Sequence, residues 1–65
     1  MLEKIGIDAG KVWSVLDESG EQSIKELRKA SGLIYNDIYA ALGWLAREGK
    51  IVLENKNDEL YITLV

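Results

Sequence analysis

The residues that most often carry out chemistry in proteins are scarce in this sequence. It has 65 residues and contains no histidine and no cysteine. Imidazole bases, thiolate nucleophiles and metal sites built from Cys or His are therefore excluded. Lysine, tyrosine, serine and carboxylate side chains remain, and no spacing in the sequence pairs a nucleophile with a base. We expect a protein that is not an enzyme and that uses no cofactor.

Two acidic groupings come closest to a chemical site. Asp17 and Glu18 are adjacent in the sequence, so a helix directs their carboxylates to different sides, and they make a poor acid–base pair. Residues 54–59 are rich in oxygen ligands, but they do not fit the familiar calcium loop, which needs a central glycine and a bidentate glutamate at its last position. We interpret the first grouping as a solvated helix end and the second as a hairpin turn, and we predict no metal site.

The composition predicts one small globular domain over residues 1–65. Hydrophobic residues make up 48% of the sequence and charged residues 29%, which is typical of folded proteins. A chain of this size buries only ~60% of the surface that its unfolded form exposes, so it supports one modest core. The absence of cysteine fits a reducing compartment, and the longest apolar run, residues 40–46, is far shorter than the ~18 residues that span a bilayer. We expect a cytoplasmic protein that does not contact membranes.

The spacing of apolar residues predicts two helices in the first half of the chain. The first covers residues 3–19 and ends before Gly20, which suits a left-handed cap. The second opens with Ser23 and Glu26, whose spacing is that of a capping box, and it runs to about residue 31. The residues expected to face the core are Ile5, Ala9, Val12, Trp13 and Leu16 in the first helix and Ile24, Leu27 and Ala30 in the second.

The second half predicts one more helix and a β-hairpin. The helix covers residues 34–48 and ends at Gly49. Every second residue is a large aliphatic one in 51–54 and in 60–65, as in strands with one inward face, and residues 55–58 are suited to a turn. A hairpin alone is marginal in water, so one of its faces must pack on the helices. The expected inward residues are Ile34, Ile38, Ala41, Leu42 and Leu45 in the helix and Ile51, Leu53, Leu60 and Ile62 in the hairpin.

This order of elements resembles the winged helix-turn-helix superfamily. The resemblance rests on Ser-Ile-Lys-Glu-Leu at 23–27, Ser-Gly-Leu at 31–33 and Arg-Glu-Gly-Lys-Ile at 47–51. More narrowly, residues 41–51 together with 9–13 resemble a family of very small bacterial winged-helix proteins of unknown function. The resemblance implies an α+β fold with three helices followed by a two-stranded β-hairpin wing. In the superfamily the third helix enters the major groove of DNA and the wing reaches the flanking backbone or minor groove.

On a helical wheel the third helix turns a small and weakly charged face outward. DNA-reading helices use Arg, Lys, Asn or Gln for base edges and several cations for phosphates. This face offers one asparagine, and its only cation lies at the far end, in a chain whose net charge is −3. The sequence therefore disfavours DNA as the partner. The outward strip consists of Asn36, Ala40, Gly43 and Arg47, with Tyr35 and Tyr39 on one flank and Asp37 and Trp44 on the other.

A dimeric DNA-binding transcriptional regulator with weak, salt-sensitive binding stays open as the alternative function. The second helix carries three cations against one glutamate, a local charge of +2, whereas residues 50–59 carry −1. In helix-turn-helix proteins this helix crosses the DNA backbone, where cations bind phosphate. The residues that contact DNA under this alternative are Lys25, Arg28, Lys29, Asn36, Lys50 and Lys56.

The same surfaces favour contact with protein. Ala40 and Gly43 leave a smooth strip on the third helix, and Gly6, Gly10 and Ser14 leave a second strip on the first. Glycine inside a helix costs ~1 kcal/mol relative to alanine, so we expect a packing reason for it. We predict a non-enzymatic module that associates with a second copy or with another protein in a regulatory role. The candidate interface consists of Gly6, Gly10, Tyr35, Asn36, Tyr39, Ala40, Gly43 and Trp44.

Several of these residues have a second interpretation. Gly6 and Gly10 either pack closely against the protein's own wing or form a dimer contact. Trp44 either packs beneath the wing or is partly exposed at an interface, whereas Trp13 is expected in the core because it lies on the apolar face of its helix. The two tyrosines of the third helix lack the positive groove in which bases stack, so boundary packing or an interface is favoured for them. The sequence identifies no partner, no DNA site and no small-molecule ligand.

Overall fold

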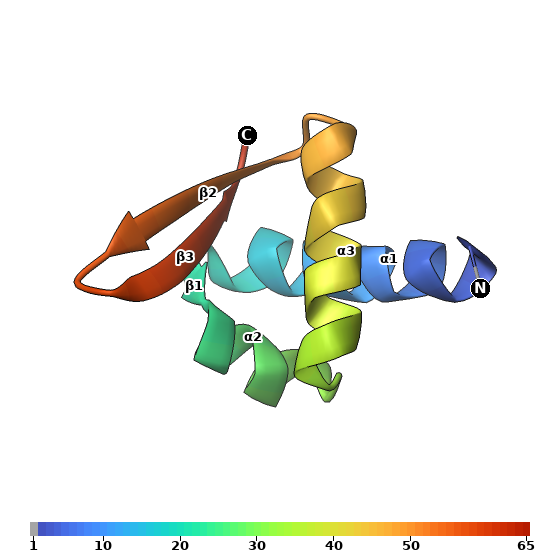
Figure 1. Cartoon of the computed structure of the whole chain (residues 1–65), viewed down its shortest axis with the longest axis horizontal. Helices are drawn as coiled ribbons and strands as arrows, with labels where there is room; N and C mark the ends of the chain where they lie inside the picture. The colour runs from blue at the N-terminus through green and yellow to red at the C-terminus, as the bar shows by residue number, and fades with distance from the viewer. Residues whose placement is uncertain (1) are drawn as a thin grey trace.

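The structure, a computed structural model, describes residues 2–65 as three helices and a small antiparallel sheet. In Figure 1, α3 crosses in front of α1, α2 lies near the N-terminal end of α3, and the β2–β3 hairpin extends away from the helices. This arrangement confirms the predicted α+β winged helix. The elements are α1 (Leu2–Ser19), β1 (Gln22–Ser23), α2 (Ile24–Ser31), α3 (Tyr35–Arg47), β2 (Ile51–Lys56) and β3 (Glu59–Leu64).

The sheet contains one strand that the sequence did not predict. Gln22 and Ser23 form β1, which pairs antiparallel with β3 opposite Ile62 and Tyr61, so the strand order is β1-β3-β2. A strand of two residues shows no alternation of apolar and polar side chains, and the pattern therefore gives no signal for it. Its effect is to attach the middle of β3 to the segment between α1 and α2.

Local signals at the helix ends behave as predicted. The Ser23 amide donates to Glu26 Oε1 at 2.9 Å, and the Glu26 amide donates to Ser23 Oγ at 3.2 Å, which completes the capping box. Gly20 and Gly49 follow α1 and α3 with φ of 76° and 69°, a left-handed backbone that favours glycine. The predicted hairpin turn narrows to residues 57–58, both with positive φ, as in a type I′ turn.

The core lies where α1, α2 and α3 meet the inner face of the hairpin. Val12, Leu27, Ile38 and Ile62 have no exposed surface, and each comes from a different element. Burying side chains of this size contributes roughly 1.5–3 kcal/mol each. The complete set of buried apolar residues is Ala9, Val12, Leu16, Ile24, Leu27, Ile38, Ala41, Leu42, Leu45, Ile51 and Ile62.

Two predicted core residues are partly exposed. The prediction for Trp13 is wrong, because its side chain is 39% exposed. Val12 and Leu16 fill the centre of the buried stripe, and Trp13 lies at its edge beside Gly10, which has no side chain to cover the indole. The prediction for Leu53 is also wrong, since it is 44% exposed. It lies on β2, the outer strand of the sheet, whereas its buried partner Ile62 lies on the central strand.

Two further residues expected to face inward are exposed. Ile34 is the N-cap of α3 with an extended backbone, so it lies outside the helix to which the wheel was applied. Ala30 belongs to the last turn of the short helix α2 and faces a surface hollow. The wheel therefore predicts burial well only for residues inside helices that are covered along their whole length.

Candidate protein-contact surface

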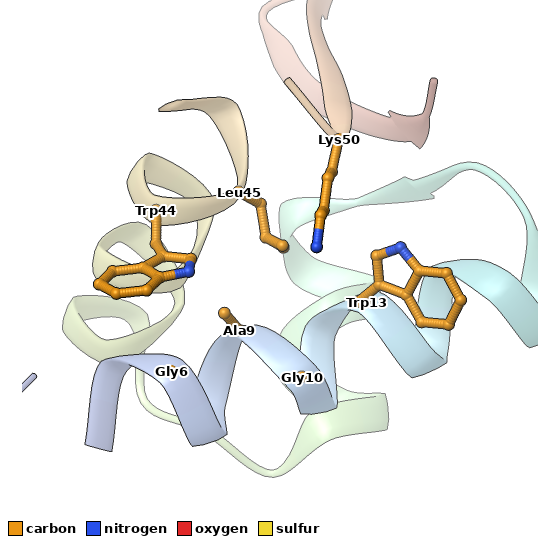
Figure 2. A pocket seen from close by; sticks show the side chains of 7 residues that line it. All are labelled: Gly6, Ala9, Gly10, Trp13, Trp44, Leu45 and Lys50. Atoms are coloured by element: carbon orange, nitrogen blue, oxygen red, sulfur yellow. The ribbon is translucent and has the colours of Figure 1, made fainter. Parts of the chain in front are cut away.

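A pocket of about 390 Å³ lies between α1 and the C-terminal half of α3. Figure 2 shows Trp13 of α1 and Trp44 of α3 on opposite sides of it, with the Lys50 side chain directed into the space between them. Both indoles are 39% exposed, which agrees with partial exposure of Trp44. The pocket is lined by Gly6, Ala9, Gly10, Trp13, Trp44, Leu45 and Lys50.

The glycines of this pocket are not required by packing within the chain. A Cβ atom placed on Gly6 or Gly10 meets no atom within 4 Å beyond the local helix backbone, and the same holds for Gly43 on α3. The alternative that Gly6 and Gly10 pack closely against the protein's own wing is therefore wrong. Each glycine still destabilises its helix by roughly 0.5–1 kcal/mol relative to alanine. The open space above them is available to another molecule.

Two further hollows adjoin this pocket. One lies on the other side of α1, where Gly10 is shared and Ile7, Lys11 and Ser14 contribute. The other lies at the end of α3, where Trp44 is shared with Leu2, Arg47 and Glu48. We call the surface formed by these three hollows together the α1 trough.

The α1 trough is more positive than the rest of the molecule. It contains three cations, Lys11, Arg47 and Lys50, and one anion, Glu48, for a local charge of +2. The other five cations and ten anions of the sequence carry −5, which gives the net charge of −3. Within residues 2–65 the ion pairs use Lys4 and Lys56, and none uses a cation of the trough.

Lys4 ties together the two helices that form the trough. Its Nζ donates to Asp8 of α1 at 2.6 Å and to Asp37 of α3 at 3.0 Å. The hydrogen bond to Asp8, followed by the one to Asp37, raises the pKa of Lys4 above its ordinary value. Asp8 is buried, so this contact also supplies the partner that a buried carboxylate requires.

The predicted interface residues divide between two places. Gly6, Gly10 and Trp44 lie together in the pocket, whereas the others do not line it. As predicted, the outward strip of α3 is exposed, and Tyr35 and Tyr39 on its flank are 40% and 53% exposed. The residues outside the pocket are Tyr35, Asn36, Tyr39, Ala40 and Gly43.

The six predicted DNA contacts are also divided. Lys50 lines the pocket beside α1, and Lys56 donates to Glu21 at 2.9 Å and lies 5.5 Å from the ring of Tyr61. The hydrogen bond to Glu21 raises the pKa of Lys56. Arg28 covers the Tyr35 ring at 5.3 Å. The other four residues, Lys25, Arg28, Lys29 and Asn36, are exposed and lie outside the pocket, and the three cations among them form no ion pair within residues 2–65.

Sequence reasoning missed the contribution of Trp13 and Lys50 to the pocket. A signal for Trp13 is present, since it follows Gly6 and Gly10 at helical spacing and so lies on the flank of the strip that they form. The direction of Lys50 has no comparable signal, because it follows the turn at Gly49 and depends on how β2 leaves α3.

The structure adds two observations about other classes of site. In residues 2–65, the side chains form no group of three or more potential metal ligands. No helix in this part of the chain has the length and apolar character needed to cross a membrane. The cytoplasmic location stays a prediction.

Comparison with known proteins gives one family and two relatives. A family model described as winged helix-turn-helix domain (DUF2582) matches residues 1–64. The uncharacterised protein MJ1608 of Methanocaldococcus jannaschii is 40% identical over 65 residues, which are 95% of this chain and 90% of that protein. The solution NMR structure of protein BT2368 from Bacteroides thetaiotaomicron has a TM-score of 0.87 and 42% identity, covering 95% of this chain and 76% of the other. These likenesses support the fold and name no activity.

Proposed function

We propose a function from the premise that this chain belongs to the winged helix-turn-helix family DUF2582: it is a protein-association module that pairs with a second copy through the α1 trough. It acts as a binding module and not as an enzyme, in keeping with a sequence that lacks histidine and cysteine. A regulatory role in the cytoplasm is part of the same proposal.

One observation carries the proposal, namely two half-exposed tryptophans that flank helical glycines with open space above them. Tryptophan is enriched at the centres of protein interfaces, where it fills a pocket on the partner. Glycine allows another backbone to approach closely. Association through this surface covers the exposed indole of Trp13 and gives Gly10 a structural reason that the single chain does not provide.

The distribution of charge supports protein over DNA as the partner. Binding to DNA depends on several cations that neutralise phosphates along one face. Here Lys50 lines the α1 pocket, Lys56 is bound to Glu21, and the outward strip of α3 has one cation, Arg47. The α1 trough combines a modest positive charge with an apolar surface, and in a second copy the exposed carboxylates of Asp17 and Glu18, at the end of α1, supply the opposite charge.

Sedimentation velocity of the full chain, from low to high micromolar concentration, tests the proposal. We expect the mass to rise from that of a monomer to that of a dimer, and the tryptophan emission to shift to shorter wavelength as the Trp13 indole is covered. Gly10→Glu introduces a long charged side chain into the trough and should abolish the rise in mass. Gly43→Glu is the matched control, since Gly43 is also a helical glycine with open space above it, and it should retain the rise.

A wild-type chain that stays monomeric at high micromolar concentration contradicts the proposal. Equal effects of Gly10→Glu and Gly43→Glu on the mass would show that the contact between the two copies does not lie at the α1 trough.

DNA binding stays as the second candidate, because the exposed cations of α2, Lys25, Arg28 and Lys29, lie on the helix next to the start of α3. Amide spectra recorded with and without duplex DNA at low salt distinguish the two candidates. We expect no shifts at these three residues or at Asn36. Shifts at all four that decrease on adding salt would favour the DNA-binding alternative.

A further inference from the structure

The last turn of α1 carries two carboxylates that lack a cationic partner. Asp17 and Glu18 are exposed, they form no ion pair within residues 2–65, and this turn contains no basic residue. The C-terminal end of a helix is the negative end of its dipole, where acidic side chains are unfavourable and cations are favoured. A cation supplied by another molecule therefore stabilises this end of α1.

Two cations of the α1 trough, Lys11 and Lys50, form no ion pair within residues 2–65. Lys11 lies near the middle of α1, and Lys50 reaches the pocket beside Gly10. Since helix residues three, four and seven apart share a face, Gly10, Ser14 and Asp17 form one strip on α1. Trp13 lies on the flank of this strip that faces Lys50, and Lys11 and Glu18 lie on the opposite flank.

We infer that two copies pair with their α1 helices antiparallel and the two-fold axis close to Ser14, so that Lys11 and Lys50 of each copy bind Glu18 and Asp17 of the other. This inference rests on the proposed function and specifies its geometry. A two-fold axis at Ser14 places residue 11 of one copy opposite residue 17 of the other, and residue 10 opposite residue 18. Because a two-fold pair brings like flanks together, Glu18 falls beside Lys11, and Asp17 falls above Gly10 near Lys50.

The same register accounts for the small and aromatic residues. The two Ser14 side chains meet at the axis, where their small size allows the helices to approach. The two Trp13 rings lie on one flank close to the axis and cover each other, which explains why each is left partly exposed in the single chain. An axis at Gly10 is the obvious alternative, but it brings Glu3 opposite Asp17 and leaves like charges facing each other at both ends.

Disulfide cross-linking tests the register directly, because the chain has no cysteine of its own. Ser14→Cys is a nearly isosteric change at an exposed position and should form a cross-linked dimer rapidly on oxidation. Ser19→Cys is the matched control on the same helix. In the inferred register the two residues at position 19, one from each copy, are ten helix residues apart, roughly 15 Å along the helix axis. This separation is beyond the ~7 Å limit on the Cα–Cα distance of a disulfide.

Charge reversal tests the ion pairs. Lys11→Glu and Glu18→Lys each place like charges together twice in the dimer, and each should weaken self-association by roughly tenfold. The double variant Lys11→Glu/Glu18→Lys restores opposite charges and should recover the wild-type dissociation constant. An equimolar mixture of the two single variants should form heterodimers for the same reason.

The outcomes separate this inference from the proposed function. If the chain dimerises but Ser14→Cys cross-links no faster than Ser19→Cys, or if the double variant fails to recover, then the antiparallel α1 register is wrong and the association proposal stands. A wild-type chain that stays monomeric overturns both.

Discussion

The two flanks of α3 carry aromatic rings that are similarly exposed but differ in what lies over them. On the α2 side, the Arg28 guanidinium lies over the Tyr35 ring, 5.3 Å from its centroid. On the α1 side, Trp44 stands half exposed across from Trp13. Both flanks belong to the same helix and rest on the same core. The difference indicates that the α1 side is the one shaped for a partner.

The largest effect on stability is expected from a substitution in the core beneath both flanks of α3. Ile38 of α3 has no exposed surface, and Ile38→Ala removes buried contacts and leaves a cavity, so we expect the free energy of unfolding to fall by about 2–5 kcal/mol. Urea titration followed by circular dichroism measures this change. A loss below ~1 kcal/mol would show that the core is less continuous beneath the two flanks than the burial indicates.

A smaller effect should be confined to the α2 flank. Ser23→Ala removes the hydroxyl that accepts from the Glu26 amide at 3.2 Å, and loss of such a cap costs about 1 kcal/mol of stability. We expect the dissociation constant of the dimer to stay unchanged in the same variant, because Ser23 lies outside the α1 trough. A parallel loss of association would mean that the two flanks are coupled.

Replacing a helical glycine, Gly10 or Gly43, with alanine distinguishes an effect on helix stability from an effect on self-association. Gly10→Ala should raise the free energy of unfolding of the monomer by roughly 0.5–1 kcal/mol, because the added Cβ meets open space. The same methyl group should weaken self-association by holding the partner helix away. Gly43→Ala should give the gain in stability without the loss of association. Thermal unfolding at low concentration, together with sedimentation, measures both quantities, and the comparison fails if the two variants behave alike.

The smallest effect concerns the pH dependence of the ion pairs made by two exposed lysines, Lys4 and Lys56. The pKa values of Lys4 and Lys56 are raised above the ordinary value of 10.5, first by hydrogen bonds to Asp8 and to Glu21 respectively. Each pair therefore contributes stability fully below pH 10.5, and this contribution is lost as the pH rises through the higher pKa of the folded state.

We expect Lys4→Met and Lys56→Met each to lose slightly less stability than the wild type between neutral pH and pH values above 10.5. Urea titrations at both ends of this range measure the difference. Lys11→Met serves as the control, because Lys11 has no ion pair within residues 2–65, and it should follow the wild-type curve. An identical pH response in all four proteins would contradict the expectation.

Most of the fold follows from local patterns in the sequence. The capping box at Ser23, the helix-ending glycines and the hairpin turn each depend on a few neighbouring residues, and the structure confirms them. The predicted exposure of Asn36, Ala40 and Gly43 also holds, since it follows from helix periodicity once the buried face of α3 is known.

The candidate site was less predictable, because its parts meet only through tertiary structure. The exposure of Trp13 depends on the absence of a side chain at Gly10 and on the angle at which α3 crosses α1. The position of Lys50 depends on the path of β2. Leu53 shows the same limitation, since alternation gives the face of a strand but not whether the strand is central or at the edge of the sheet.

The short strand β1 has a consequence for cooperativity. Ser23 pairs with Tyr61 of the hairpin and is at the same time the N-cap of α2. Detaching the hairpin therefore frees the residue that begins α2, so the wing and the second helix form one unit of local unfolding. Amide hydrogen exchange should reveal this as matched protection in β3 and the first turn of α2, although 38 positions separate Ser23 from Tyr61 in the sequence.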